Sequence, residues 1–296
     1  VALSAGAGIL VGYGLLRMGR LPMATAAEVG VVATGIPFDA TQEAIQEARD
    51  SALSWTADLA GRGVVAIVGP EAPAPGVSEV RATDSARARI ARESGVPILA
   101  GALQPVPGEP GAMFNAMLWF APLPEEDTVY RKRRLVPLVE GSGTREGSAA
   151  PLLATRSGQL GVLICFESVF EDMARTYRRA GAGILINATN DAWGEGTSGP
   201  AQHALHLALR AVETRAAVIR VSNRGVSFAV DPLGRVIEVH ERPGAYVMRV
   251  PLSDTVPPYV RWGDWVGMGS VILVAGGVVV SGRGGALPRP SRDRRA

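Results

Sequence analysis

The chain has 296 residues, of which 47% are hydrophobic and 20% are charged, and its formal net charge is +2. This composition excludes a disordered or collagen-like chain, and the length allows one large domain or two smaller ones. The single cysteine, Cys165, excludes an internal disulfide and a multi-cysteine metal cluster. The basic excess lies in residues 283–296, which carry five arginines against one aspartate. Because the rest of the chain is slightly acidic, a nucleic-acid-binding face is not expected.

Uncharged segments lie near both ends of the chain. The first 16 residues carry no charge, and residues 265–282 are also uncharged. Three aromatic residues, Tyr259, Trp262 and Trp265, stand just before this second segment and at its first position. Aromatic residues at one edge and arginines beyond the other are typical of a membrane span. We predict a transmembrane helix at 1–20, shorter than a full span, another at 265–282, and an Arg-rich cytoplasmic tail at 283–296. The alternatives are a signal-peptide core or buried helix for the first segment, and a buried core helix for the second.

The region 28–250 alternates between short apolar runs and helical periods. Strands are predicted at 29–34, 64–69, 97–103, 113–120, 159–166, 182–189, 216–222, 226–231 and 245–250, and helices at 41–63, 78–94, 168–180 and 200–215. Because β-branched runs separated by helices indicate buried strands with helical covers, we expect one layered α/β domain. Linkers are expected at 17–27 and 252–262.

Cys165 follows an apolar run and precedes a helical pattern. A strand end that turns into a helix exposes a side chain and offers backbone N–H groups, which can lower the pKa of a thiol and bind an oxyanion. The alternative is a buried cysteine that acts as a small hydrophobic residue, which is the commoner case.

Lys132 is the only lysine among 30 basic residues. A compact ammonium suits a tight pocket beside a developing oxyanion better than a guanidinium does, although one lysine could also survive by chance. Glu71 follows the apolar run 64–69, where α/β sites form, although a solvated carboxylate is the alternative. The three residues supply a nucleophile, an electrophilic stabiliser and a base, and we expect them to converge on one pocket.

The histidines give a weaker prediction. His203 and His206 share one face of a predicted helix and His240 follows a strand, so none has an evident pairing with Cys165. A Cys–His hydrolase stays open as an alternative. No carboxylate spacing supports a metal site at the two helical histidines, and no cofactor or metal is expected.

Five stretches follow one another along the chain: GPEAPAP around Glu71, YRKRRLVPLVE around Lys132, ICFES around Cys165, NATNDAWGEGTSGPAQH from Asn187, and RAVETRAAVIRVSNRGVSFAVDPLG up to Gly234. In this order they resemble the bacterial apolipoprotein N-acyltransferase family of the nitrilase (carbon–nitrogen hydrolase) superfamily. The resemblance implies a four-layer α-β-β-α nitrilase-like sandwich at 28–250, flanked by transmembrane helices.

The resemblance also implies roles for individual residues. Glu71 would be the general base, Lys132 the stabiliser of the oxyanion and Cys165 the nucleophile. Glu140 and Glu167 match supporting acids of the family. The candidates for an oxyanion or substrate pocket are Phe166, Asn190 and Trp193.

The implied reaction moves an acyl chain from a phospholipid to Cys165 as a thioester, and then to the α-amine of a diacylglyceryl-cysteine lipoprotein. The expected partners are therefore the phospholipid donor, the diacylated apolipoprotein acceptor and membrane lipids. The expected location is the bacterial cytoplasmic membrane, with the catalytic domain on the extracytoplasmic side. Two alternatives stay open. The short Gly/Ser-rich segment between Glu140 and Cys165 would suit a membrane-tethered amidase that acts on small amides, and a catalytically silent lipoprotein-binding paralogue is the other.

Overall fold

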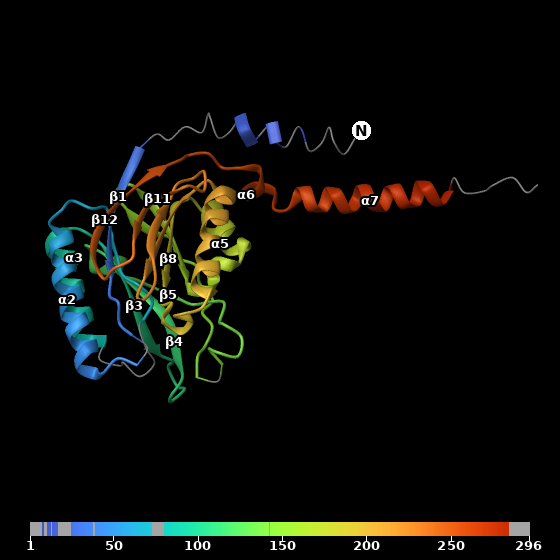
Figure 1. The fold of residues 1–296 in the computed structure, drawn as a ribbon. Coiled ribbons are helices and arrows are strands. Elements are labelled where there is room, and N and C mark those ends of the chain that lie inside the picture. Colours follow the sequence, from blue (N-terminus) through green and yellow to red (C-terminus); the bar gives the residue numbers. More distant parts are fainter. Residues whose placement is uncertain are drawn as a thin grey trace, which may run out of the picture.

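Two six-stranded sheets lie face to face in the computed structural model, and helices cover the outer face of each sheet (Figure 1). The structure describes residues 8, 11–12, 14–16, 25–37, 39–72, 80–141 and 143–283. The first sheet has the order β12-β1-β2-β3-β4-β5, and α2 and α3 pack on it. The second has the order β11-β10-β9-β8-β7-β6, and α4 and α5 pack on it. This is the four-layer α-β-β-α arrangement that the family resemblance implies, and it agrees with the layered α/β domain expected from the apolar runs.

The strands and helices have the following bounds. The first sheet contains β1 (Thr25–Ala33), β2 (Ile67–Val68), β3 (Ile98–Pro105), β4 (Met113–Phe120), β5 (Thr128–Arg131) and β12 (Gly244–Leu252). The second contains β6 (Leu153–Thr155), β7 (Gly158–Ile164), β8 (Ala182–Thr189), β9 (Ala217–Ser222), β10 (Ser227–Val230) and β11 (Val236–His240). The helices are α2 (Gln42–Ala60), α3 (Val80–Ser94), α4 (Glu171–Arg179), α5 (Gly199–Thr214), α6 (Pro258–Trp262) and α7 (Trp265–Arg283). Short 3-10 turns are η1 (Pro124–Glu126), η2 (Cys165–Val169) and η3 (Ala192–Gly194).

The main core lies between the two sheets. Val29 and Val31 of β1 pack in one cluster with Val162 of β7 and Leu185 of β8, and all four are fully buried. A second cluster joins α2 and α3 to the first sheet, with Leu59 and Ala91 against Ile98. Central strands buried on both faces explain the unbroken apolar runs in the sequence.

Two of the predicted strands, at 159–166 and 64–69, are longer than the strands observed there. The strand predicted at 159–166 ends at Ile164, because the backbone of Cys165 is left-handed and begins η2. The strand predicted at 64–69 pairs regularly over Ile67–Val68, although the residues before it are also buried. The sequence patterns did not identify β5, β6, β11 or α6, which are short.

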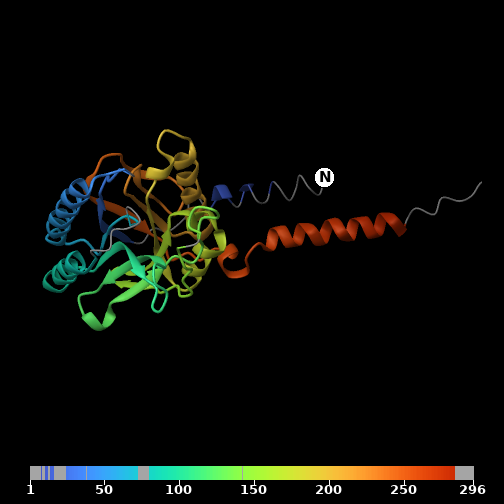
Figure 2. The same ribbon diagram turned by 90° about the horizontal axis from the view of Figure 1, so that it is seen from below.

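Residues 265–282 form a helix, α7, which extends away from the sandwich on the side opposite α2 and α3 (Figure 2). In the part of the chain that the structure describes, however, no helix combines the length and the apolar character needed to cross a bilayer. The predicted membrane span at 265–282 is therefore not supported, since spanning takes about 20 predominantly apolar residues. Most of the segment predicted at 1–20, and nearly all of the tail at 283–296, lie outside the described residues.

Candidate active site

Lys132 follows β5 directly, and its ammonium lies between two carboxylates. Nζ is 3.2 Å from Oε1 of Glu71 and 2.8 Å from Oε2 of Glu140, and the lysine side chain is 1% exposed. Burial lowers the pKa of Lys132, but the charges of Glu71, Cys165 and Glu140 outweigh it and raise the pKa above its ordinary value. Lys132 is therefore a positive charge at neutral pH, held in the protein interior.

Glu71 lies in the loop after β2, at the carboxyl end of a central parallel strand. Its Oε1 accepts a hydrogen bond from Asn115 at 2.6 Å, and its Oε2 accepts the backbone N–H of Asn190 at 3.0 Å. A Cβ at Gly101 on β3 would lie 2.3 Å from the carbonyl oxygen of Pro70 and 2.7 Å from the carbonyl carbon of Glu71. Glycine at position 101 therefore lets this loop pass close to β3 and bring its carboxylate to the lysine.

Asn115 on β4 links the two carboxylates, and the sequence analysis did not single it out. Its Nδ2 donates to Oε1 of Glu71 at 2.6 Å and to Oε1 of Glu140 at 2.9 Å. Its backbone carbonyl accepts the N–H of Lys132 at 2.8 Å. The signal in the sequence is a polar residue inside the apolar run MFNAMLWF, on a strand that is otherwise mostly buried.

Cys165 begins η2, directly after β7, with a φ of 48°. Its side chain is buried, and burial raises the pKa of the thiol to about 12; the charge of Glu71 adds to this effect and that of Lys132 opposes it. The three residues expected to converge are therefore within electrostatic reach of one another. A thiol this weakly acidic needs a base before it can attack, and Glu71 is a carboxylate whose charge acts on it directly.

Glu167 joins the turn that begins at Cys165 to the turn after β5. Its Oε2 accepts the N–H of Ile164 at 2.7 Å and the hydroxyl of Tyr130 at 2.6 Å, and its Oε1 accepts the N–H of Arg133 at 2.6 Å. The side chain is fully buried, and this burial raises its pKa. Because one carboxylate binds the backbone at the end of β7 and the backbone that follows β5, it fixes the turn at Cys165 relative to the turn that carries Lys132.

The three expected pocket residues lie in different surroundings. Asn190 reaches the cluster through its backbone N–H, which binds Glu71. Phe166 packs edge-on against Phe170, with ring centroids 5.1 Å apart. Trp193 lies in η3 and is 59% exposed at the surface.

His203 on α5 lies next to Cys165, a proximity that the sequence did not reveal. Its Nε2 is 2.9 Å from the backbone carbonyl oxygen of Cys165, so the contact that the structure gives is to the backbone and not to the sulfur. His240 lies elsewhere and stacks on Tyr246. Within the described ranges, no group of three or more His, Cys, Asp and Glu residues is placed to hold a metal ion.

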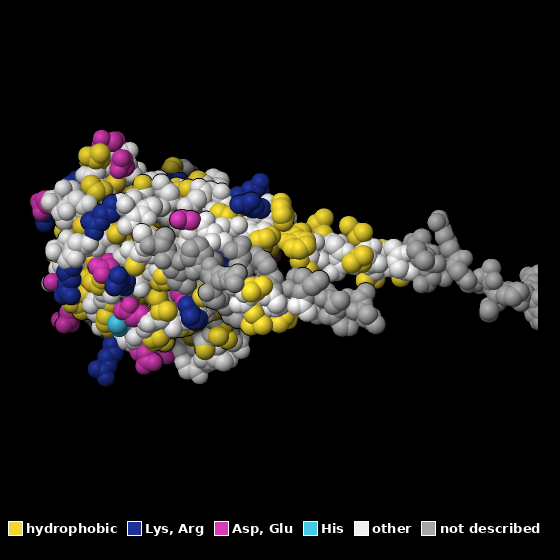
Figure 3. Space-filling model, turned by 90° about the horizontal axis from the view of Figure 1, so that it is seen from above, with side chains coloured by type: hydrophobic (Ala, Val, Ile, Leu, Met, Phe, Trp, Pro, Cys, Tyr) yellow, Lys and Arg dark blue, Asp and Glu magenta, His cyan; other side chains and the backbone are white. Residues whose placement is uncertain are grey.

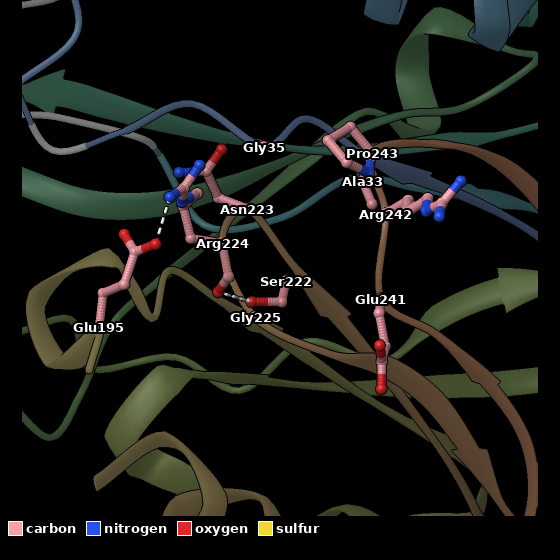
Figure 4. A pocket seen from close by; sticks show the side chains of 10 residues that line it. All are labelled: Ala33, Gly35, Glu195, Ser222, Asn223, Arg224, Gly225, Glu241, Arg242 and Pro243. Carbon is pink, nitrogen blue, oxygen red and sulfur yellow. Dashed lines mark hydrogen bonds and ion pairs between the residues drawn. The ribbon is translucent and has the colours of Figure 1, made fainter. Parts of the chain in front are cut away.

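The structure contains a pocket of about 260 Å³ (Figure 4). Its lining residues come from the end of β1, the β9–β10 turn, the segment after η3 and the turn before β12: Ala33, Gly35, Glu195, Ser222, Asn223, Arg224, Gly225, Glu241, Arg242 and Pro243. Nδ2 of Asn223 donates to Oδ1 of Asn190 at 3.0 Å, and Arg224 pairs with Glu195 at one side. The amide of Asn223 is buried and also binds Thr34 and Ile36, so it connects the end of the first sheet to Asn190, whose backbone N–H binds Glu71.

Comparison with known proteins shows the family and the fold of the chain. A sequence model of the carbon–nitrogen hydrolase family matches residues 32–254. The apolipoprotein N-acyltransferase of Gloeobacter violaceus is 40% identical over 151 residues, which make up 50% of this chain and 28% of that protein. Apolipoprotein N-acyltransferase 1 of Treponema pallidum is 31% identical over 196 residues, covering 56% of this chain and 36% of that protein. The chain thus spans about a third of the length of these curated relatives.

The solved structures show the same fold. A mutant of the amidase from Nesterenkonia sp. AN1 superposes with a TM-score of 0.63 at 21% identity, covering 82% of this chain and 98% of the amidase. A second mutant of this nitrilase-superfamily amidase gives a TM-score of 0.62 at 22% identity. At these identities the likeness concerns the fold. Because the family match covers most of the folded domain, the chain belongs to the carbon–nitrogen hydrolase family.

Proposed function

We propose that the protein is a lipoprotein N-acyltransferase with a Glu71–Lys132–Cys165 triad. The observation that carries this proposal is the buried ammonium of Lys132, which lies between Glu71 and Glu140 and acts electrostatically on the buried thiol of Cys165. The names of the curated relatives support acyl transfer to a lipoprotein. The other parts of the catalytic proposal follow from what each group can do chemically.

In the first half-reaction, the carboxylate of Glu71 takes the proton of the Cys165 thiol as the sulfur attacks an ester carbonyl of a phospholipid. The Lys132 ammonium stabilises the oxyanion of the tetrahedral intermediate. Glu140 holds the ammonium in place, and Asn115 holds the carboxylate of Glu71. The C–O bond of the ester then breaks. The lysophospholipid leaves as an alcohol with the proton that Glu71 returns, and the acyl chain stays on sulfur as a thioester.

In the second half-reaction, the neutral α-amine of a diacylglyceryl-cysteine attacks the thioester carbonyl. Glu71 accepts a proton from the amine, Lys132 again stabilises the oxyanion, and the C–S bond breaks. The proton held by Glu71 returns to the sulfur of Cys165, and the product is an amide. The thioester retains much of the energy of the original ester, so the transfer needs no cofactor. Water must be kept out, since hydrolysis would compete.

Exposed apolar side chains support a lipid substrate. Leu138, which lies between Lys132 and Glu140, is fully exposed, and Val139 is 75% exposed. Apolar side chains also project along α7 and near its start (Figure 3), among them Trp262, Trp265, Met268, Val271, Ile272, Leu273 and Val274. We propose that these surfaces bring the domain to phospholipid at the extracytoplasmic side of the bacterial cytoplasmic membrane.

The test is an acyl-transfer assay with the full chain in membranes. A phospholipid labelled in its acyl chain and a diacylated lipopeptide are supplied, and the label is followed on the protein and on the peptide. We expect a labelled thioester on the protein that hydroxylamine releases, followed by label in an amide at the peptide amine. Cys165→Ala is the control, and it should show neither product.

The same assay separates the alternatives. Ammonia release from small amides without label on the lipopeptide would replace the acyltransferase with an amidase. Absence of a labelled thioester, together with binding of the lipopeptide, would indicate a catalytically silent lipoprotein-binding protein and contradict the proposal.

A further inference from the structure

The backbone carbonyl of Cys165 accepts hydrogen bonds from three side chains. Nε2 of His203 lies 2.9 Å from the carbonyl oxygen, Oγ of Ser168 lies 3.0 Å from it, and Nδ2 of Asn187 lies 3.2 Å from it. A carbonyl oxygen has two lone pairs, so three donors around it strongly restrict the rotation of this peptide plane. The residue proposed as the nucleophile is thus held through its backbone.

The hydrogen bonds to this carbonyl act at a residue with an unfavourable backbone conformation. Cys165 has a φ of 48°, a left-handed conformation that a residue with a Cβ adopts when its surroundings impose it. The same conformation ends β7 and begins η2, and it leaves the thiol under the influence of Glu71 and Lys132. Release of the carbonyl would let the turn relax toward ordinary backbone angles and carry the sulfur away from these two groups.

Arg220 on β9 contacts two of the three donors from behind, and its side chain is 1% exposed. Its Nη1 donates to Oδ1 of Asn187 at 2.8 Å, and its Nη2 lies 3.3 Å from Nδ1 of His203 and also pairs with Asp191. A guanidinium can only donate. The carbonyl oxygen of Cys165 can only accept, so Nε2 of His203 carries the proton that faces it, while Nδ1 lies between Arg220 and Oδ1 of Asp191, 3.5 Å away. In the same way, the amide oxygen of Asn187 is turned to the arginine and its NH2 group to the carbonyl.

We propose that Arg220 is a positioning residue that fixes the Cys165 carbonyl by holding the imidazole of His203 in place and by setting the orientation of the Asn187 amide. The proposal deepens the acyl-transfer mechanism and rests on it for the reaction that is measured. It gives His203 a role different from that of a general base. The imidazole orients the backbone of the nucleophile, while proton transfer at the sulfur belongs to Glu71.

Four variants test this proposal. Arg220→Lys keeps the positive charge beside Asp191 but loses the fork that reaches both donors. His203→Leu removes the Nε2–H donor, and His203→Gln restores an N–H at the corresponding distance from the backbone. Arg178→Lys is the matched control, because Arg178 is also a buried arginine that binds backbone carbonyls, at Ala182 and Ser253, away from Cys165.

The first measurement is the rate of thioester formation from labelled phospholipid. We expect Arg220→Lys and His203→Leu to be slower by about 10- to 100-fold, as for a misplaced reacting group. His203→Gln should recover most of the rate, and Arg178→Lys should stay near the wild-type rate even if its Tm falls. Wild-type rates in Arg220→Lys or His203→Leu would overturn the proposal, as would a His203→Gln variant as slow as His203→Leu.

The second measurement is the pH dependence of Cys165 alkylation by iodoacetamide, which needs no lipid. The charged groups that act on the thiol are Glu71, Lys132 and Asp191, and burial holds its pKa high. A released turn moves the sulfur out of this environment, so the profile of Arg220→Lys should shift to lower pH. A variant that only loosens the fold lowers Tm and leaves the profile in place, and that result for Arg220→Lys would contradict positioning. If the wild-type chain forms no thioester, the proposed function fails, and the alkylation profiles still decide this proposal.

Discussion

The two sheets hold their parts of the site in different ways. The first sheet contributes Glu71, Asn115 and Lys132. Glu71 forms an ion pair with Lys132 and accepts a hydrogen bond from the side-chain amide of Asn115. The second contributes Cys165, whose carbonyl is bound by side chains from β8 and α5, while its sulfur faces the charges of the first sheet. The charged groups thus fix each other, whereas the nucleophile is fixed through its backbone. Substitutions on the two sheets should therefore have different consequences.

The largest effect is expected for Cys165→Ala, which removes the reacting atom and leaves the charges of the first sheet in place. Acyl-enzyme formation should be abolished, while Tm stays close to that of the wild type because the side chain is small. The measurement is labelled thioester together with thermal unfolding. Residual labelling that hydroxylamine still releases would move the nucleophile to another residue.

Lys132→Arg tests the first sheet and should lower thioester formation by about 100-fold, the usual result of losing one oxyanion donor. The guanidinium keeps the charge but is larger and planar, so it does not fit between Glu71 and Glu140 as the ammonium does. Single-turnover labelling measures the effect. Arg131→Lys is the control, since Arg131 donates to Gln104 and not to the triad. A fully active Lys132→Arg would show that a compact ammonium is not needed.

Glu167→Gln tests the connection between the sheets. The amide cannot accept at both ends, so backbone N–H groups on one side lose their charged acceptor, at a cost of about 1.5–3 kcal/mol in the free energy of unfolding. Activity should fall by about tenfold or more. Tyr130→Phe, which removes a side-chain donor to the same carboxylate, should be milder in both respects. Equal effects of the two variants would mean that the backbone connection is not what matters.

The thiol of Cys165 also makes the free energy of unfolding depend on pH. Its pKa rises from 9.0 to about 12 on folding, so folding favours the protonated form. This contribution is complete below pH 9 and is lost as the pH rises toward 12. The wild type should therefore lose more free energy of unfolding than Cys165→Ala across this range, as denaturant titrations would show. Parallel curves for the two proteins would contradict the raised pKa.

The smallest effect is expected away from both halves of the site. Thr41 caps α2, where its hydroxyl accepts the N–H of Ala44 at 3.2 Å. Thr41→Ala should cost about 1 kcal/mol of stability without changing the rate of thioester formation. A change in rate would show that the outer helices are coupled to the site.

The apolar runs predicted a layered α/β domain, and the family resemblance implied its four layers. Glu71 and Cys165 drew attention because each follows an apolar run, and Lys132 because it is the only lysine, so these three candidates could be chosen from the sequence. Asn115, Asn187 and Arg220 could not be identified in this way. Their contacts join residues 17 to 44 positions apart, and within a strand they are single polar residues in apolar runs. The end of β7 was predicted two residues too late because the left-handed backbone of Cys165, which no local sequence pattern indicates, ends the strand and begins η2. The membrane span at 265–282 rested on counting apolar residues, and α7 does not meet the requirement.

Gly101 shows that an active site also depends on an atom that is missing. It lies on β3, behind the loop that carries Glu71, and a single methyl group there would meet the backbone of that loop. Substitution by alanine would push the base away from the lysine without altering any group that takes part in the chemistry. The tolerance of position 101 therefore measures how far Glu71 can move before the site stops working, which no substitution of Glu71 itself can do.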